Sequence, residues 1–208
     1  MIPLFVDCAG KRIVIFGGGE VASRKAAFFS GEAEVLVVSR SFSQKMSGLP
    51  VERRTVDTSK VTDEVLTGII DGAFLVIGAF SDTAQNNRIK DLCMKRLILF
   101  NSADGEPGDV ILPAVTHKKN YTVAISTQGN SPAVSRFLRE YLETHLPSLD
   151  EMVALQRDLR ACLKEYEPSV TERNVILKEV LHDPVIWEKL AHEPARVWKY
   201  VQERYLHE

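Results

Sequence analysis

The chain has 208 residues, of which 45% are hydrophobic and 26% charged, and its formal net charge is −2. These values are typical of an ordinary globular protein of one large or two small domains, and they exclude a polybasic tail, so we expect no nucleic-acid partner. The start, MIPLFVDCAGKR, has no basic region followed by a long apolar one, and no run approaches the roughly 18 apolar residues of a membrane span, so we expect a cytoplasmic protein without membrane contact.

Residues 12 to about 100 alternate between strand-like and helix-like runs. Helices are expected from residue 21, near 61–70 and over 82–95, and the strand-like runs between them are RIVIF (12–16), EVLVV (34–38), VERRTV (51–56), FLVIG (74–78) and LILF (97–100). This alternation predicts βαβ units and therefore a parallel sheet.

Three glycines follow the first strand directly, in IVIFGGGEVASRK (13–25). The spacing Gly17-x-Gly19-x-x-Ala22 fits a dinucleotide-binding turn, in which Gly17 makes the tight turn, Gly19 admits the pyrophosphate and Ala22 packs helix on strand. The phosphates would lie at the helix N-terminus, where unpaired N–H groups point outward. A purely structural turn is the alternative. We expect cofactor contacts from Gly17, Gly18, Gly19, Glu20, Val21 and Ala22.

The second strand ends in Ser39-Arg40-Ser41, where NAD-binding proteins usually carry Asp or Glu. Arg40 could accept the 2′-phosphate of NADP, but an exposed arginine at a strand end needs no function. The residues alone therefore leave NAD and NADP open, with Ser39 and Arg40 as candidate contacts.

Two polar loops follow the fourth and fifth strand-like runs, at the edge where such sheets bind ligands. Ala79, Asp82 and Asn101 are candidate cofactor contacts, although Asp82 also suits a helix cap. Asp104 could serve as a general base, but Asp104-Gly105 is also good turn chemistry.

The pattern changes after residue 114. KNYTVAIST (119–127) predicts one further strand, and Ser131-Pro132 is a good start for a long amphipathic helix, after which all segments are helical in pattern. We predict an α/β fold with a Rossmann-type parallel sheet over 1–114, a dimerisation region of strand plus long helix over 115–148, and an all-helical domain over 149–208. The many short amphipathic helices favour a homodimer.

Together these motifs resemble the precorrin-2 dehydrogenase and sirohydrochlorin ferrochelatase family of siroheme synthesis. The resemblance covers nearly the whole chain and rests on PLFVD (3–7), GGGEVASRK (17–25), Asn101-x-x-Asp104 and STQGNSP (126–132) before SRFLRE. It implies NAD as the cofactor, Asp104 as the catalytic aspartate, and oxidation of precorrin-2 to sirohydrochlorin by transfer of a hydride to NAD and of a proton to the base. The chain departs from the family at Phe80 and Ser81, where relatives tend to read A-T-D-D.

A tetrapyrrole carries many carboxylates, so the resemblance also implies a basic substrate site. Candidates are Ser126, Ser131, Lys118 and Arg136, with Lys119 and Arg139 nearby, although a basic run is often merely solvated. Part of the family also inserts ferrous iron, which would be a substrate here: the histidines and cysteines show no ligand spacing, and we expect no resident metal. The alternatives are a non-catalytic NAD(H)-sensing module with a helical signalling tail, and a dehydrogenase of a small metabolite.

Overall fold

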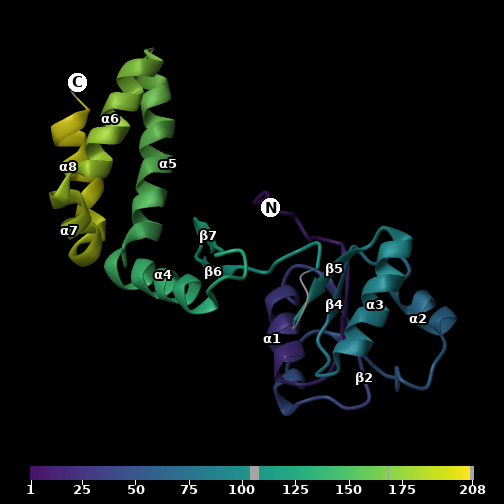
Figure 1. The fold of residues 1–208 in the computed structure, drawn as a ribbon. Helices are drawn as coiled ribbons and strands as arrows, with labels where there is room; N and C mark the ends of the chain where they lie inside the picture. Colours follow the sequence, from purple (N-terminus) through teal and green to yellow (C-terminus); the bar gives the residue numbers. More distant parts are fainter. Residues whose placement is uncertain (104–107, 168, 207–208) are drawn as a thin grey trace. The chain divides into compact units, whose positions relative to one another are not determined.

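The computed structural model describes residues 1–103, 108–167 and 169–206. The chain divides into two compact units, Met1–Leu112 and Pro113–Glu208 (Figure 1). The proposed catalytic residue Asp104 lies outside the described residues.

The first unit is built on a five-stranded parallel sheet. Its strands are β1 (Arg12–Phe16), β2 (Glu34–Ser39), β3 (Glu52–Thr55), β4 (Leu75–Gly78) and β5 (Leu99–Ser102), in the order β3-β2-β1-β4-β5. Phe16 at the end of β1 is level with Val38 of β2 and Gly78 of β4, so the carboxyl ends of the three central strands meet at one edge. The predicted α/β fold with a Rossmann-type sheet is confirmed.

Helices cover both faces of this sheet because alternate strand residues point to opposite sides. Ile13 and Ile15 pack in one buried cluster with Ala22 of helix α1 (Glu20–Phe29) and Met46 of the short 3-10 helix η1 (Gln44–Met46). Val14 and Phe16 pack on the other side against α2 (Asp63–Ile70) and α3 (Thr83–Arg96). The full burial of Ala22 is the close helix-to-sheet packing expected from the sequence.

The second unit begins with an antiparallel hairpin, β6 (Ala114–His117) and β7 (Thr122–Ile125). The sequence predicts only one strand here, and β6 corrects that expectation. Its four residues follow Pro113 directly and acquire a strand partner only because the chain reverses after His117, where the Lys118 N–H donates to the Tyr121 carbonyl at 2.9 Å.

The rest of the second unit is helical, as predicted, with α4 (Pro132–His145), α5 (Leu149–Tyr166), α6 (Val170–His182), α7 (Pro184–His192) and α8 (Pro194–Tyr205). Pro132, Pro184 and Pro194 each occupy the first turn of a helix, where a missing N–H costs nothing. The helices α5 to α8 bury their own apolar cluster around Leu159 and Val201. In the described part of the chain, no helix is both long enough and apolar enough to cross a membrane.

Candidate functional site

The glycine turn after β1 is held between two neighbouring segments of backbone. Gly17 has φ +121°, and a Cβ there would lie 2.5 Å from the Ala79 carbonyl oxygen. A Cβ at Gly18 would lie only 1.8 Å from the Ser41 carbonyl oxygen. Both positions therefore need glycine for the fold itself, whatever the turn binds.

Gly19 is different, because a Cβ there would meet no atom within 4 Å. Its backbone is extended and it is the N-cap residue of α1. The space in front of the first N–H groups of α1 is therefore open. Such a helix end attracts anions through its unpaired donors and its dipole, so the turn offers a place for the pyrophosphate of a dinucleotide.

The segment that follows β2 forms one wall of this space. The Gly17 N–H donates to the Val38 carbonyl at 2.9 Å, and the Ser43 N–H donates to the Gly18 carbonyl at 2.7 Å. The hydroxyls of Ser23 and Ser43 share a further hydrogen bond of 2.7 Å. Residues 39–43 are thus tied to the glycine turn and to α1, with Ser39, Arg40 and Ser41 lining the open space.

The loop after β4 forms the opposite wall and is held by a buried amide. Asn86, 2% exposed, accepts from the Phe80 N–H at 3.1 Å and donates to the Phe80 carbonyl at 2.9 Å. Phe80 packs against Phe16 with ring centroids 6.1 Å apart. Asp82 accepts from the Ala84 N–H at 2.9 Å and so caps α3, which is the structural role that the sequence also allowed.

A third wall, which the sequence analysis missed, consists of Asp57, Thr58 and Ser59 just after β3. Arg88 of α3 holds this segment by donating to the carbonyls of Thr58 at 2.9 Å and Val61 at 2.8 Å. The only signal in the sequence is that these polar residues follow a strand at the carboxyl edge. Hydrogen bonds from Ser59 lower the pKa of Asp57 below its usual value, and Lys60 adds to this effect.

These walls enclose a cavity of about 1080 Å³ at the carboxyl ends of β1, β2 and β4, a size suited to a cofactor. Most of the predicted cofactor contacts line it, namely Gly17, Gly18, Gly19, Glu20, Val21, Ser39, Arg40, Ala79 and Asp82. Ala22 is buried in helix packing instead. The residues present fit a dinucleotide. Gly17 and Gly18 have no room for a side chain and keep the turn tight, while Gly19 leaves the N-terminus of α1 open.

Asn101 does not line the cavity, because its side chain is used elsewhere. It is 5% exposed, and its Oδ1 accepts from Lys25 Nζ at 2.9 Å while its Nδ2 donates to the Val110 carbonyl at 2.7 Å. Burial, with the nearby charge of Arg24, lowers the pKa of Lys25. The amide thus joins α1, the end of β5 and the returning chain at Val110.

The four predicted substrate contacts all lie in the second unit. Lys118 is exposed in the hairpin turn. Ser126 accepts from the Gln128 N–H at 3.0 Å, and Ser131 caps α4 by accepting from the Val134 N–H at 3.3 Å. Arg136 donates to Glu140 at 2.8 Å. The described residues contain no cluster of three or more His, Cys, Asp or Glu side chains that could hold a metal ion.

Comparison with known proteins gives consistent matches. Residues 4–114 match the family described as "Putative NAD(P)-binding". The chain is 39% identical over 191 residues to a precorrin-2 dehydrogenase of Methanosarcina barkeri, covering 89% of this chain and 85% of that relative.

Longer relatives match over part of their length. A siroheme synthase of Neisseria meningitidis is 32% identical over 176 residues, which are 82% of this chain but only 36% of that protein. Among solved structures, SirC, a precorrin-2 dehydrogenase, superposes with a TM-score of 0.74 at 22% identity, covering 98% of this chain and 100% of that one, which supports the fold.

Proposed function

The chain belongs to the precorrin-2 dehydrogenase and siroheme synthase family, and on that premise we propose that it oxidises precorrin-2 to sirohydrochlorin with NAD as the hydride acceptor. The observation that carries the proposal is the open N-terminus of α1 at Gly19, next to a tight turn at Gly17 and Gly18. It lies within the residues that match an NAD(P)-binding family, at the edge of the sheet where ligands of this fold class bind.

The first unit binds and orients the cofactor. The backbone at Gly17 to Val21 would receive the pyrophosphate and Ser39 and Arg40 would contact the adenosine ribose, with Ala79 to Asp82 forming the wall opposite. Bound NAD supplies the acceptor for the hydride that leaves the macrocycle. The hydrogen bonds that fix residues 39–43 and Phe80 hold these walls in place before binding.

The reaction also releases a proton, because the macrocycle loses two hydrogens and NAD takes one of them with both electrons. We assign the proton to Asp104, which the family resemblance makes the catalytic aspartate. Three residues before it in the sequence, Asn101 is anchored to Lys25 and Val110. Asn101 is a positioning residue in this scheme.

The second unit supplies the contacts to the tetrapyrrole carboxylates. Lys118, Ser126, Ser131 and Arg136 are the proposed contacts. Lys118 is exposed on the hairpin, whereas Arg136 would exchange or share its bond to Glu140 with a substrate carboxylate. Arginine and lysine pair strongly with carboxylates once both partners are withdrawn from water.

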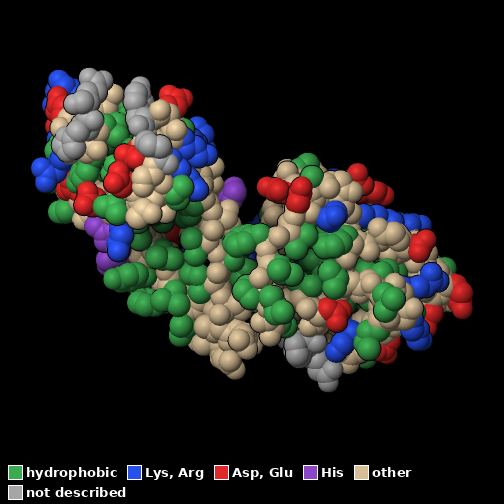
Figure 2. Space-filling model, turned by 90° about the horizontal axis from the view of Figure 1, so that it is seen from above, with side chains coloured by type: hydrophobic (Ala, Val, Ile, Leu, Met, Phe, Trp, Pro, Cys, Tyr) green, Lys and Arg blue, Asp and Glu red, His purple; other side chains and the backbone are tan. Residues whose placement is uncertain are grey.

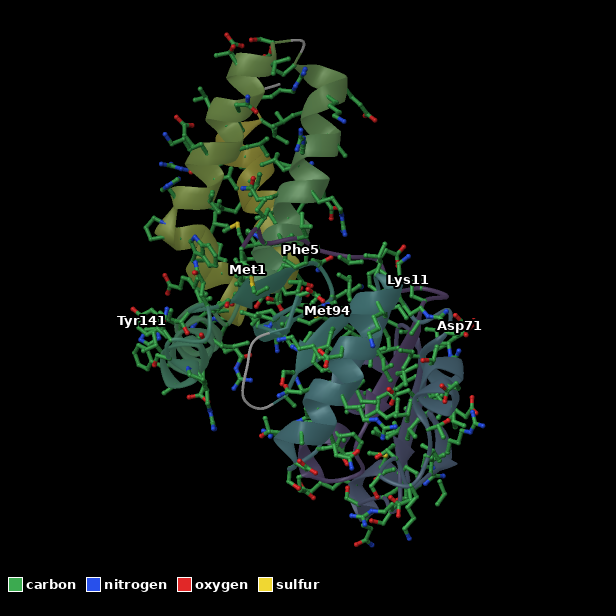
Figure 3. All side chains as sticks on the ribbon, turned by 45° about the vertical axis from the view of Figure 1, so that its right-hand side comes forward. Met1, Phe5, Lys11, Asp71, Met94 and Tyr141 are labelled. Atoms are coloured by element: carbon green, nitrogen blue, oxygen red, sulfur yellow. The ribbon has the colours of Figure 1, made fainter. Side chains whose placement is uncertain are left out.

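The helix α4 gives a reason to propose a homodimer. Val134, Phe137, Leu138 and Tyr141 are 46%, 62%, 40% and 48% exposed although they follow one another at helical spacing, and Tyr141 projects outward from the helix (Figure 3). Hydrophobic side chains are also visible on the surface of both units (Figure 2). An apolar stripe of this kind usually marks an interface, and a second copy of the chain is the proposed partner.

Light scattering tests the dimer. The chain should run as a dimer at micromolar concentration, and Phe137→Asp should shift it toward the monomer. Glu143→Gln, on the opposite side of α4, is the matched control and should leave the dimer intact. A monomeric parent protein would contradict the proposed assembly.

The decisive assay for the activity follows the reduced nicotinamide by its absorbance while precorrin-2 is supplied, with the product identified by its spectrum. Formation of sirohydrochlorin in step with NADH supports the proposal. Binding of NAD without any turnover of precorrin-2 would refute it and favour a sensing module. A second reaction containing sirohydrochlorin and ferrous iron determines separately whether the chain also inserts iron.

A further inference from the structure

We propose that Arg40 recognises the 2′-phosphate of NADP, so that the cavity accepts NADP as well as NAD. The inference rests on the proposed function only in that the cavity holds a dinucleotide. It concerns which of the two dinucleotides can enter, and it assigns Arg40 as the specificity-determining residue.

The position of Arg40 is fixed by the fold. It directly follows the last residue of β2, the place where proteins with this turn contact the adenosine ribose. Its neighbours are held on both sides: the Val56 N–H donates to the Ser39 carbonyl at 3.0 Å, and the Ser43 N–H donates to the Gly18 carbonyl at 2.7 Å. The Ser41 carbonyl lies so close to Gly18 that no side chain fits there. Arg40 therefore extends from a rigid segment of the cavity wall.

Among the residues that the structure describes, the guanidinium of Arg40 has no partner. Throughout residues 1–103, 108–167 and 169–206, no side chain forms a hydrogen bond or an ion pair with it. By contrast, the carboxylates that line the cavity are all engaged. Glu20 pairs with Lys45 at 2.5 Å, Asp57 accepts from Ser59 at 2.6 Å, and Asp82 caps α3.

The end of β2 lacks the carboxylate that excludes NADP from NAD-selective sites. An NAD-selective site places a carboxylate at the end of the second strand, where it accepts from the ribose hydroxyls and repels a 2′-phosphate. Here Ser39 and Ser41 flank the arginine, and serine hydroxyls can donate to a phosphate as well as to a ribose oxygen. A free arginine between two serines thus attracts the phosphate without preventing NAD from binding.

Calorimetric titration with NAD and with NADP tests the inference. The parent chain should bind NADP at least as tightly as NAD, and the advantage of NADP should fall as salt is added, because ionic attraction is screened. Arg40→Ala should weaken NADP by about 10-fold to 100-fold, the range of a hydrogen bond to a charged group, while NAD changes less than about threefold. Arg40→Asp should exclude NADP and retain NAD.

Two further measurements keep the result interpretable. Arg53→Ala removes the same charge from an exposed position on β3 and should alter neither affinity. Adenosine 2′,5′-bisphosphate and adenosine 5′-diphosphate should reproduce the difference between the two cofactors without the nicotinamide.

Equal losses for NAD and NADP in Arg40→Ala, or a parent chain that binds NADP more weakly than NAD, would overturn the inference while leaving the proposed function intact. Failure to bind either cofactor would instead overturn the proposed function as well.

Discussion

The sharpest test of the cofactor site is Gly19→Asp. A Cβ at Gly19 meets no atom within 4 Å, and the backbone there is extended, so the new side chain fits the folded protein. Aspartate is also a better N-cap residue than glycine and carries the charge that the helix dipole favours. The variant should therefore be as stable as the parent chain or more stable by a few tenths of a kcal/mol.

Binding should respond in the opposite direction. The carboxylate would occupy the open space in front of α1, where the pyrophosphate is proposed to lie. Two unit charges ~5 Å apart repel by about 3 kcal/mol at an effective dielectric constant of 20. That energy corresponds to a loss of affinity of roughly 10²-fold, before any steric exclusion is added.

The assay combines thermal unfolding with calorimetric titration of NAD. Gly18→Ala is the matched control, because its Cβ would lie 1.8 Å from the Ser41 carbonyl oxygen and should disturb folding before binding. A folded Gly19→Asp variant with unchanged NAD affinity would remove the helix end from the site. A strongly destabilised Gly19→Asp variant would show that the space at Gly19 is not open.

Three further predictions concern single side chains. Asp104→Asn should bind NAD normally and lose turnover by about 10² to 10⁴-fold in the absorbance assay if Asp104 is the base; a loss within about threefold would contradict that role. Asn101→Leu should lower the free energy of unfolding by about 2 kcal/mol, because Lys25 and the Val110 carbonyl lose their partner; denaturant unfolding that matches the parent would refute it. The side chain of Asp183 is 10% exposed, and although burial alone raises its pKa, hydrogen bonds from Tyr205, the Val185 N–H and Tyr200 lower it overall. The stability that the Asp183 carboxylate provides should be present above the pKa of an unfolded aspartate and be lost as pH falls through the lower pKa of the folded state. Asp183→Asn should therefore lower the free energy of unfolding by about 1 to 2 kcal/mol at neutral pH and by less in acid. A difference in unfolding free energy that stays constant across pH would disprove the assignment.

The sheet could be predicted from the sequence because its strands are short apolar runs separated by helical patterns. Ile13 and Ile15 face one side and Val14 and Phe16 the other, so the run is apolar throughout, as a strand covered on both faces must be. The glycine turn could also be predicted, but which of its glycines the fold requires could not. The sequence pattern predicts the tight turn at Gly17 alone, whereas the need for glycine at position 18 depends on the carbonyl of Ser41, which is 23 positions further along the chain.

Other features depend on contacts that no local pattern encodes. The wall at Asp57 to Ser59 exists because Arg88, about 30 residues later, binds the carbonyls of Thr58 and Val61. The strand β6 exists because β7 pairs with it. In each case the local residues are ordinary loop or strand formers, and their role depends on a distant partner.

The two named residues of the Asn101-x-x-Asp104 motif have different roles: Asn101 is structural, and Asp104 is the proposed base. The Asn101 amide both accepts and donates, and the two bonds tie Lys25 on α1 to Val110 on the returning chain. Asn101 is also 5% exposed and so offers little access to a cofactor, while a carboxylate at the same position could accept from Lys25 but could not donate to the Val110 carbonyl. The amide of Asn101 therefore fits a structural role at this position, three residues before the proposed base Asp104.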